Sequence, residues 1–179
     1  MVSFSAQRDH LSQWERYSGR HGYSIGFRGP EMTVAFGVAA QYFLMPVYYE
    51  LELQIHVLRD AIRMALAQLN SRTSDEDFLE KFALWSQNAN TTLRLLCRSF
   101  KHASFKDEAE WRASRTVYAQ SPEPIHFRSG EFGVVPYQMI GLRLKDLKLV
   151  SEIMIARTHY FLEAKRSLEL LLKSSGYAT

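Results

Sequence analysis

Apolar residues recur at helical spacing in two long segments in the middle of the chain. The first set is Leu51, Ile55, Leu58, Ile62, Ala65 and Leu69, and the second is Phe78, Phe82, Trp85, Ala89 and Leu96. Residues three and four positions apart share one face of an α-helix. The pattern predicts helices over 51–70 and 75–100, joined by the turn NSRTSD and packed antiparallel as a hairpin with the apolar stripes in the core.

The segments on either side of this hairpin carry shorter patterns. Extended pieces are predicted at 3–5 and 22–27, and after Trp111 in WRASRTVYA, PIHFR, FGVVPYQMIGLRL and LVSEIMIA. Gly26 marks a bulge or a close approach to the backbone. A short helical pattern begins at Asp9, and an amphipathic helix is predicted over 160–173. The apolar run over 32–49 fits one or two buried strands or a buried helix, and its periodicity does not decide between them.

These elements together indicate an α+β fold. We expect a mixed or antiparallel sheet built from both ends of the chain, with the helical hairpin inserted between the halves and a C-terminal helix. The chain has 179 residues, which is the size of one domain, so we expect residues 1–179 to form a single domain.

Charge and composition exclude several classes of protein. The 22 basic residues exceed the 19 acidic ones by three and form no run of three, which argues against a nucleic-acid groove. The single cysteine, Cys97, lies in an apolar stretch, so we expect inert packing and a reducing compartment. The most apolar window, 34–49, is shorter than the roughly 20 residues of a membrane helix, and Gln41 and Pro46 interrupt it. We therefore expect a soluble, cytoplasmic protein.

Two glutamates one residue apart, Glu108 and Glu110, are the candidate chemical feature. If the segment SFKDEAEWR is extended, Glu108, Glu110 and Arg112 project to one face, and if it is helical the two glutamates lie apart. The structural alternative is a charge ladder on the solvent face of an edge strand, with Trp111 and Ala113 pointing into the core. The six histidines show no i, i+4 pair, so no metal site is predicted.

Several stretches together resemble a bacterial and phage-associated family known as domain of unknown function 2971. They are SFSAQRDHLSQWERYSGRHGYSIGF, PVYYE, KHASFKDEAEWR, IHFR with VVPY, and SEIMIA followed by the helix ending in SGY. They follow the family's order and span nearly the whole chain. The family usually has a further N-terminal part before the Ser-Phe-Ser strand, and its SEIMIA strand often continues into Gly-Pro, where this chain has Ala156 and Arg157.

The Glu-x-Glu pattern also resembles ADP-ribosyltransferases, in which the second glutamate stabilises an oxocarbenium-like transition state. That resemblance implies NAD as cofactor, Glu110 as the catalytic residue and Glu108 as its helper. It also implies a cofactor pocket whose residues are Ser3, Ser5, Trp14, Tyr17 and Arg112. Such folds further need an Arg, His or Tyr on an earlier strand, and this chain has no earlier strand.

The sequence therefore leaves three functions open and does not decide whether the protein is an enzyme. The first is an NAD-using transferase or NAD-cleaving toxin that acts in phage defence. The second is a non-catalytic binding module, with dimerisation through an exposed sheet edge. The third is an RNA-contacting protein that uses arginines of the sheet face, namely Arg112, Arg115, Arg128 and Arg143.

Overall fold

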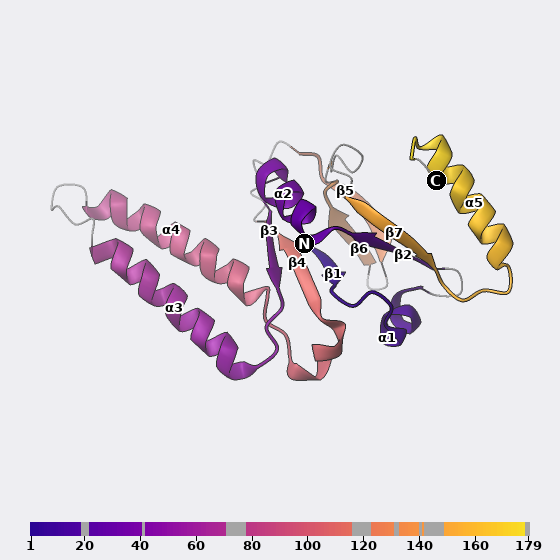
Figure 1. Ribbon diagram of the computed structural model, residues 1–179. Helices are drawn as coiled ribbons and strands as arrows, with labels where there is room; N and C mark the ends of the chain where they lie inside the picture. The colour runs from indigo at the N-terminus through magenta and orange to yellow at the C-terminus, as the bar shows by residue number, and fades with distance from the viewer. Residues whose placement is uncertain are drawn as a thin grey trace. The chain divides into compact units, whose positions relative to one another are not determined.

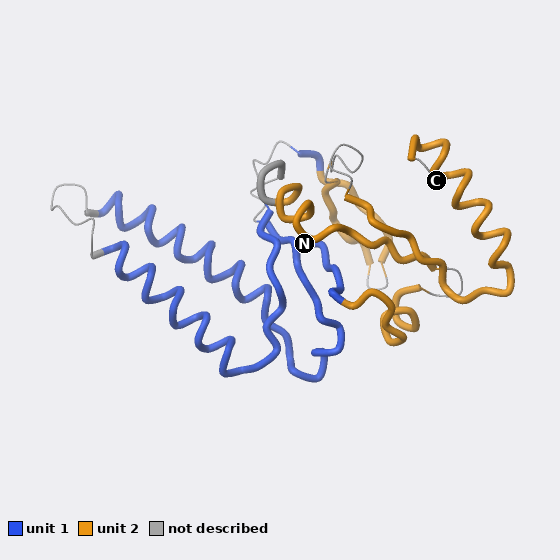
Figure 2. Tube along the Cα trace, viewed as in Figure 1, with its two compact units in different colours: residues 1–6, 42–124 blue, residues 7–41, 125–179 orange. Residues whose placement is uncertain are grey.

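The computed structural model describes residues 1–18, 22–40, 42–70, 78–115, 123–130, 133–139, 141 and 149–177. The chain forms two compact units (Figure 2): unit 1 is Met1–Ala6 with Tyr42–Pro124, and unit 2 is Gln7–Gln41 with Ile125–Thr179. Helices and strands occur in both, so the α+β class is confirmed. The expectation of a single domain stays a prediction. The strands of the described residues are distributed over three small antiparallel sheets.

Unit 1 contains a sheet of three strands, β1 (Val2–Ser5), β3 (Phe43–Pro46) and β4 (Glu110–Ser114). Their order is β1-β4-β3, so β4 lies between its two neighbours (Figure 1). In the register of β1 with β4, Ser3 lies opposite Arg112 and Ser5 lies opposite Glu110. The edge-strand interpretation of the glutamate segment is therefore wrong, because both sides of β4 are paired.

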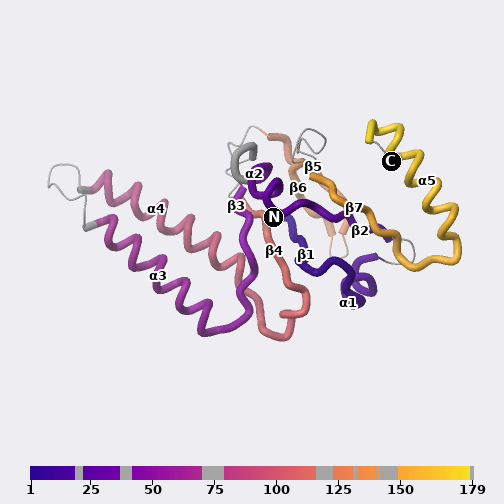
Figure 3. The backbone as a smooth tube through the Cα atoms, viewed as in Figure 1, coloured from indigo at the N-terminus to yellow at the C-terminus, as the bar shows by residue number. Residues whose placement is uncertain are grey.

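Unit 1 also contains the helical hairpin, formed by α3 (Leu51–Asn70) and α4 (Phe78–Cys97), which run antiparallel (Figure 3). The Trp85 indole Nε1 donates a hydrogen bond of 2.6 Å to the Ala65 carbonyl and joins the two helices in the half of the hairpin remote from its base. The two predicted helices are confirmed, although residues 75–77 of the second lie outside the described residues. The expectation for Cys97 is wrong, because it is exposed at the end of α4 and does not pack in the core.

The base of the hairpin is closed by backbone pairing. Tyr48 and Phe100 form a parallel bridge just before α3 and just after α4. The Gln54 side chain donates to the carbonyl oxygens of Tyr48 at 2.7 Å and Lys101 at 2.9 Å. The chain therefore leaves and rejoins the sheet region at adjacent points, as expected for an insertion.

Unit 2 pairs β2 (Tyr23–Phe27) antiparallel with β7 (Val150–Ile155), and β5 (His126–Gly130) with β6 (Gly133–Tyr137). Its helical elements are α1 (Leu11–Gln13), the π-helical turn η1 (Trp14–Ser18), α2 (Gly29–Ala40) and α5 (Phe161–Ser174). The register shifts between Gly26 and Phe27, so the predicted bulge is confirmed. The undecided apolar run is helical in α2 and extended in β3, and Met32, Ala35 and Phe36 of α2 are buried.

None of the helices in the described part of the chain is both long enough and apolar enough to span a membrane.

Candidate functional site

The glutamate segment changes conformation between its two glutamates. Residues Ala103–Glu108 form a 3₁₀ helix, η3, whose start is capped by the His102 side chain, which accepts a hydrogen bond from the Ser104 amide. Ala109 then adopts the left-handed conformation, with φ 41° and ψ 51°, and β4 begins at Glu110. Glu108 is thus not on the strand, contrary to the extended interpretation. The turn at Ala109 nevertheless leaves both carboxylates within reach of one lysine.

That lysine is Lys101, which follows the base of the hairpin. Its Nζ lies 2.5 Å from Glu108 Oε2 and 3.0 Å from Glu110 Oε2. Arg112 donates two hydrogen bonds to the Glu110 carboxylate, from Nε to Oε1 at 2.8 Å and from Nη2 to Oε2 at 2.9 Å. We name these four residues the charge cluster. Glu108 and Glu110 are each only 7% exposed, so the cluster is largely shielded from water.

Neighbouring strands and the chain before the hairpin fix the cluster in place. The Ser3 side chain forms a hydrogen bond with Glu110, and Ser5 Oγ donates to the Glu108 carbonyl at 2.8 Å. The Glu110 amide donates to the Tyr49 hydroxyl at 2.8 Å. The Glu110 carboxylate therefore has its orientation set before any ligand arrives.

The electrostatics keep Glu110 ionised. Burial would raise the pKa of Glu110, but hydrogen bonds from Arg112, Ser3 and Lys101 outweigh burial and lower the pKa to about 2. Burial would lower the pKa of Lys101, and its hydrogen bonds to Glu108 and Glu110 raise that pKa instead. The hydrogen bond to Glu110 raises the pKa of Arg112. The cluster therefore combines two basic with two acidic side chains, whose formal charges cancel.

The structure brings five of the seven predicted site residues together in unit 1: Ser3, Ser5, Glu108, Glu110 and Arg112. The other two, Trp14 and Tyr17, belong to unit 2. Trp14 Nε1 donates to Asp9 Oδ1 at 2.6 Å, and the Tyr17 side chain is 69% exposed. Their place in the cofactor pocket stays a prediction, whereas Tyr49 is an aromatic residue in contact with Glu110.

The sequence interpretation missed Lys101, which joins the two glutamates. Its only signal was its place in the stretch KHASFKDEAEWR, seven residues before Glu108. No helical or strand period links those positions, because the intervening segment is a loop and a 3₁₀ helix.

The charge-ladder alternative placed both Trp111 and Ala113 in the core. The placement of Trp111 is wrong because Trp111 is 39% exposed, whereas Ala113 is fully buried as expected.

Two of the four arginines in the RNA hypothesis are held in ion pairs of unit 1. Arg112 belongs to the charge cluster, and Arg115 lies 3.0 Å from Glu123. Arg143 lies outside the described residues. In the part of the chain that the structure describes, no group of three or more His, Cys, Asp or Glu is placed to hold a metal ion.

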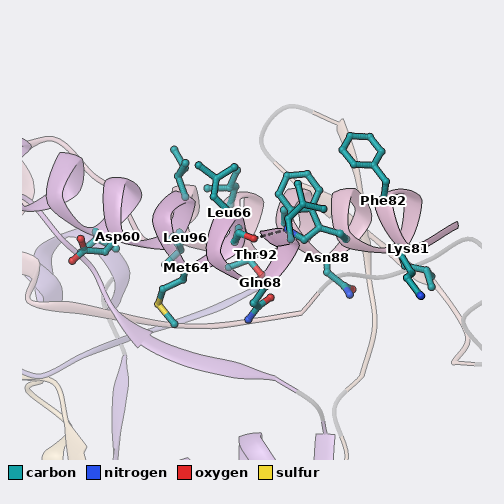
Figure 4. A pocket seen from close by; sticks show the side chains of 18 residues that line it. Asp60, Met64, Leu66, Gln68, Lys81, Phe82, Asn88, Thr92 and Leu96 are labelled. Atoms are coloured by element: carbon teal, nitrogen blue, oxygen red, sulfur yellow. Dashed lines mark hydrogen bonds between the residues drawn. The ribbon is translucent and has the colours of Figure 1, made fainter. Parts of the chain in front are cut away.

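Two grooves among the described residues are lined by residues outside the charge cluster. One runs along the hairpin with a volume of about 590 Å³ and is lined mainly by apolar residues of α3 and α4 (Figure 4). The other lies in unit 2, has a volume of about 1010 Å³, and is lined by Trp14 together with residues of β7 and α5. No residue of the charge cluster lines either groove.

The fold and site define an α+β protein with a buried, preorganised carboxylate pair at the base of a helical hairpin. A family model described as "Protein of unknown function (DUF2971)" matches residues 13–113, which is more than half of the chain. The chain belongs to this family. No curated protein and no solved structure matches it.

Proposed function

We propose that this protein is an ADP-ribosyltransferase-like or NAD-cleaving enzyme in which Glu110 is the catalytic carboxylate. The observation that supports the proposal is the convergence of Glu108, Glu110 and the Ser3 side chain in one buried, oriented arrangement. When the bond between nicotinamide and ribose breaks, nicotinamide leaves with the electron pair and the ribose gains positive charge. A carboxylate that is ionised and fixed beforehand stabilises such a charge without reorganisation.

The two cations impose a requirement on this proposal. Lys101 and Arg112 neutralise Glu110, so one of them must turn away when a dinucleotide binds. Lys101 is the candidate, because a flexible ammonium contacts the carboxylates through one atom, whereas the Arg112 guanidinium binds both oxygens of Glu110. Its released ammonium would pair with the diphosphate of NAD. A role in phage defence through NAD depletion is the biological setting that we propose for this activity.

The experiment is NAD turnover by the intact chain, measured as nicotinamide release, with Glu110→Gln beside it. We expect the wild-type chain to release nicotinamide and Glu110→Gln to lose at least about 100-fold in rate, because the charge is removed and the shape is kept. The matched control is Glu123→Gln, which removes an ion pair of the same unit at Arg115 and leaves the cluster intact. Absence of NAD binding by the wild-type chain at millimolar concentration would refute the proposal.

A non-catalytic binding or dimerisation module is the second candidate. The apolar groove along the hairpin favours it, because contiguous exposed apolar surface on soluble proteins marks sites of association. Under this alternative the charge cluster is purely structural, and Glu110→Gln would change stability with no enzymatic effect.

A further inference from the structure

The apolar stripes of α3 and α4 turn toward the same side of the hairpin. In the close view of the groove, Leu66, Phe82 and Leu96 project to one side, whereas Asp60, Met64, Gln68, Asn88 and Lys81 project to the other (Figure 4). Helical spacing adds Ile62 and Leu69 to the side of Leu66, and Ala89 to the side of Phe82. We name the side that carries Ile62, Leu66, Phe82, Ala89 and Leu96 the apolar face.

The apolar face is not buried within the chain. Ile62 is 46% exposed, Leu66 47% and Phe82 41%, and none of the described stripe residues is buried, so the expectation that these stripes form core is wrong. An amphipathic helix normally buries its apolar stripe against another element. Because both helices present their apolar stripes on the same side, we expect a further structural element to pack on that side.

We propose that the further layer is the apolar face of a second copy of this chain, so that two hairpins form an antiparallel four-helix bundle. In a two-fold interface each patch must complement itself. The hydrogen bond from Trp85 to Ala65 sets these two residues at one level of the hairpin. Counted from that level, Ala61 and Ala89 share a level near the middle of the two helices. At about 1.5 Å per residue, Phe82 lies about 10 Å to one side of Ala89 and Leu96 about 10 Å to the other. A two-fold axis at the level of Ala89 therefore sets Phe82 over Leu96 of the second copy, twice.

The size of the face suits a stable dimer. Each of the two helices has 20 residues and so spans about 30 Å, and two helices side by side are about 20 Å wide. One face thus covers about 600 Å², and a dimer would bury about 1,200 Å² in total, which is at the lower end of specific interfaces.

The charge of the hairpin also allows self-association. The acidic and basic residues of α3 are equal in number and are Glu52, Asp60, Arg59 and Arg63. In α4 the two basic residues Lys81 and Arg94 exceed the single acidic residue Glu80 by one. The formal net charge of the two helices together is therefore +1. Two hairpins therefore repel each other weakly. A strongly basic or acidic partner has no matching excess of charge on this element.

The test measures the molar mass of the full-length chain by sedimentation equilibrium across a concentration series that reaches about 100 μM. We expect wild-type dimers, and at least an approximately 30-fold weaker dimer for Leu66→Glu, because a charge buried within the interface would be unpaired. The matched control is Ala67→Glu, on the same helix, exposed and not among the residues that line the groove, which should leave dimerisation unchanged.

Three results would overturn the inference. They are a wild-type monomer at every concentration, a dimer that Leu66→Glu leaves intact, and equal weakening by both variants. Circular dichroism checks that each variant folds, and Ile62→Glu tests the same face if Leu66→Glu does not fold. The inference is independent of NAD chemistry, so a dimer without turnover would leave it standing and refute only the proposed enzyme.

Discussion

At the scale of single residues, the depressed pKa of Glu110 connects the charge cluster to stability. The pKa falls from its ordinary 4.5 to about 2 in the folded chain, so the unfolded state binds more protons between these pH values. Stability from Glu110 is therefore fully present above about pH 5 and is lost as the pH falls through 4.5 toward 2.

We predict that Glu110→Gln lowers the free energy of unfolding by about 3 kcal/mol at pH 7, because the variant leaves Lys101 and Arg112 partly unpaired in a buried place. The difference from wild type should shrink below pH 4.5 and nearly vanish near pH 2, as urea denaturation at a series of pH values would reveal. Glu123→Gln, whose side chain is 41% exposed, should change stability far less. A pH-independent difference would contradict this account.

The residue scale is also where prediction from sequence was weakest. Alternation along a strand anticipated the grouping of Glu108, Glu110 and Arg112, and only the resemblance to ADP-ribosyltransferases implied Ser3. Glu108 nevertheless reaches the site from a 3₁₀ helix by way of left-handed Ala109. An alanine in that conformation has no sequence signature, because glycine is the residue that signals it. Lys101 was missed because the closed base of the hairpin, rather than local spacing, carries it to the glutamates.

At the scale of elements, the bulge in the pairing of β2 with β7 depends on Gly26. A Cβ at this position would lie 2.7 Å from Glu152 Cγ and 3.0 Å from Ser151 Oγ. Glu152 has little freedom to move, because Arg8 holds its two oxygens with Nε and Nη2 at 2.7 and 2.6 Å. The glycine therefore allows a close approach of the two strands.

We predict that Gly26→Ala destabilises the protein by about 1–2 kcal/mol, because the new methyl group must displace Glu152 or spread the strands. Thermal denaturation monitored by circular dichroism would measure the loss. Gly29→Ala is the matched control, since nothing lies within 4 Å of a Cβ at Gly29. If both variants melt at the same temperature, the close approach at Gly26 has no energetic consequence.

Elements with a clear period were predictable, and those without one were not. The two hairpin helices and the strands at Ser3 and Tyr23 followed from spacing and alternation. The segment over 32–49 remained undecided because α2 buries Met32, Ala35 and Phe36 within an apolar sequence that has little polar contrast. How far the hairpin is buried could not be predicted either. An apolar stripe indicates that a helix packs against something, but it does not show which element or which chain the helix packs against.

At the scale of the whole molecule, the division into two units predicts that the strands of one unit open separately from those of the other. Each unit combines segments distant in sequence, and among the described residues unit 1 holds one sheet and unit 2 holds two. We predict that Glu110→Gln lowers amide protection in β1, β3 and β4 only, and that Gly26→Ala lowers it in β2 and β7 only, as native-state hydrogen exchange would resolve. Loss of protection across the strands of both units in either variant would instead support the single cooperative domain expected from the length of the chain.

The closed base of the hairpin has a consequence for how the protein tolerates change. Gln54 and the bridge between Tyr48 and Phe100 join the incoming and outgoing chain before the helices extend away. The distal turns of α3 and α4 therefore make no contact that positions Lys101 against Glu108 and Glu110. Matched deletions of whole helical turns from the far ends of both helices would shorten the hairpin without moving the Lys101 ammonium from the carboxylates of Glu108 and Glu110. The length and surface of the hairpin can therefore change in evolution while the charge cluster stays the same.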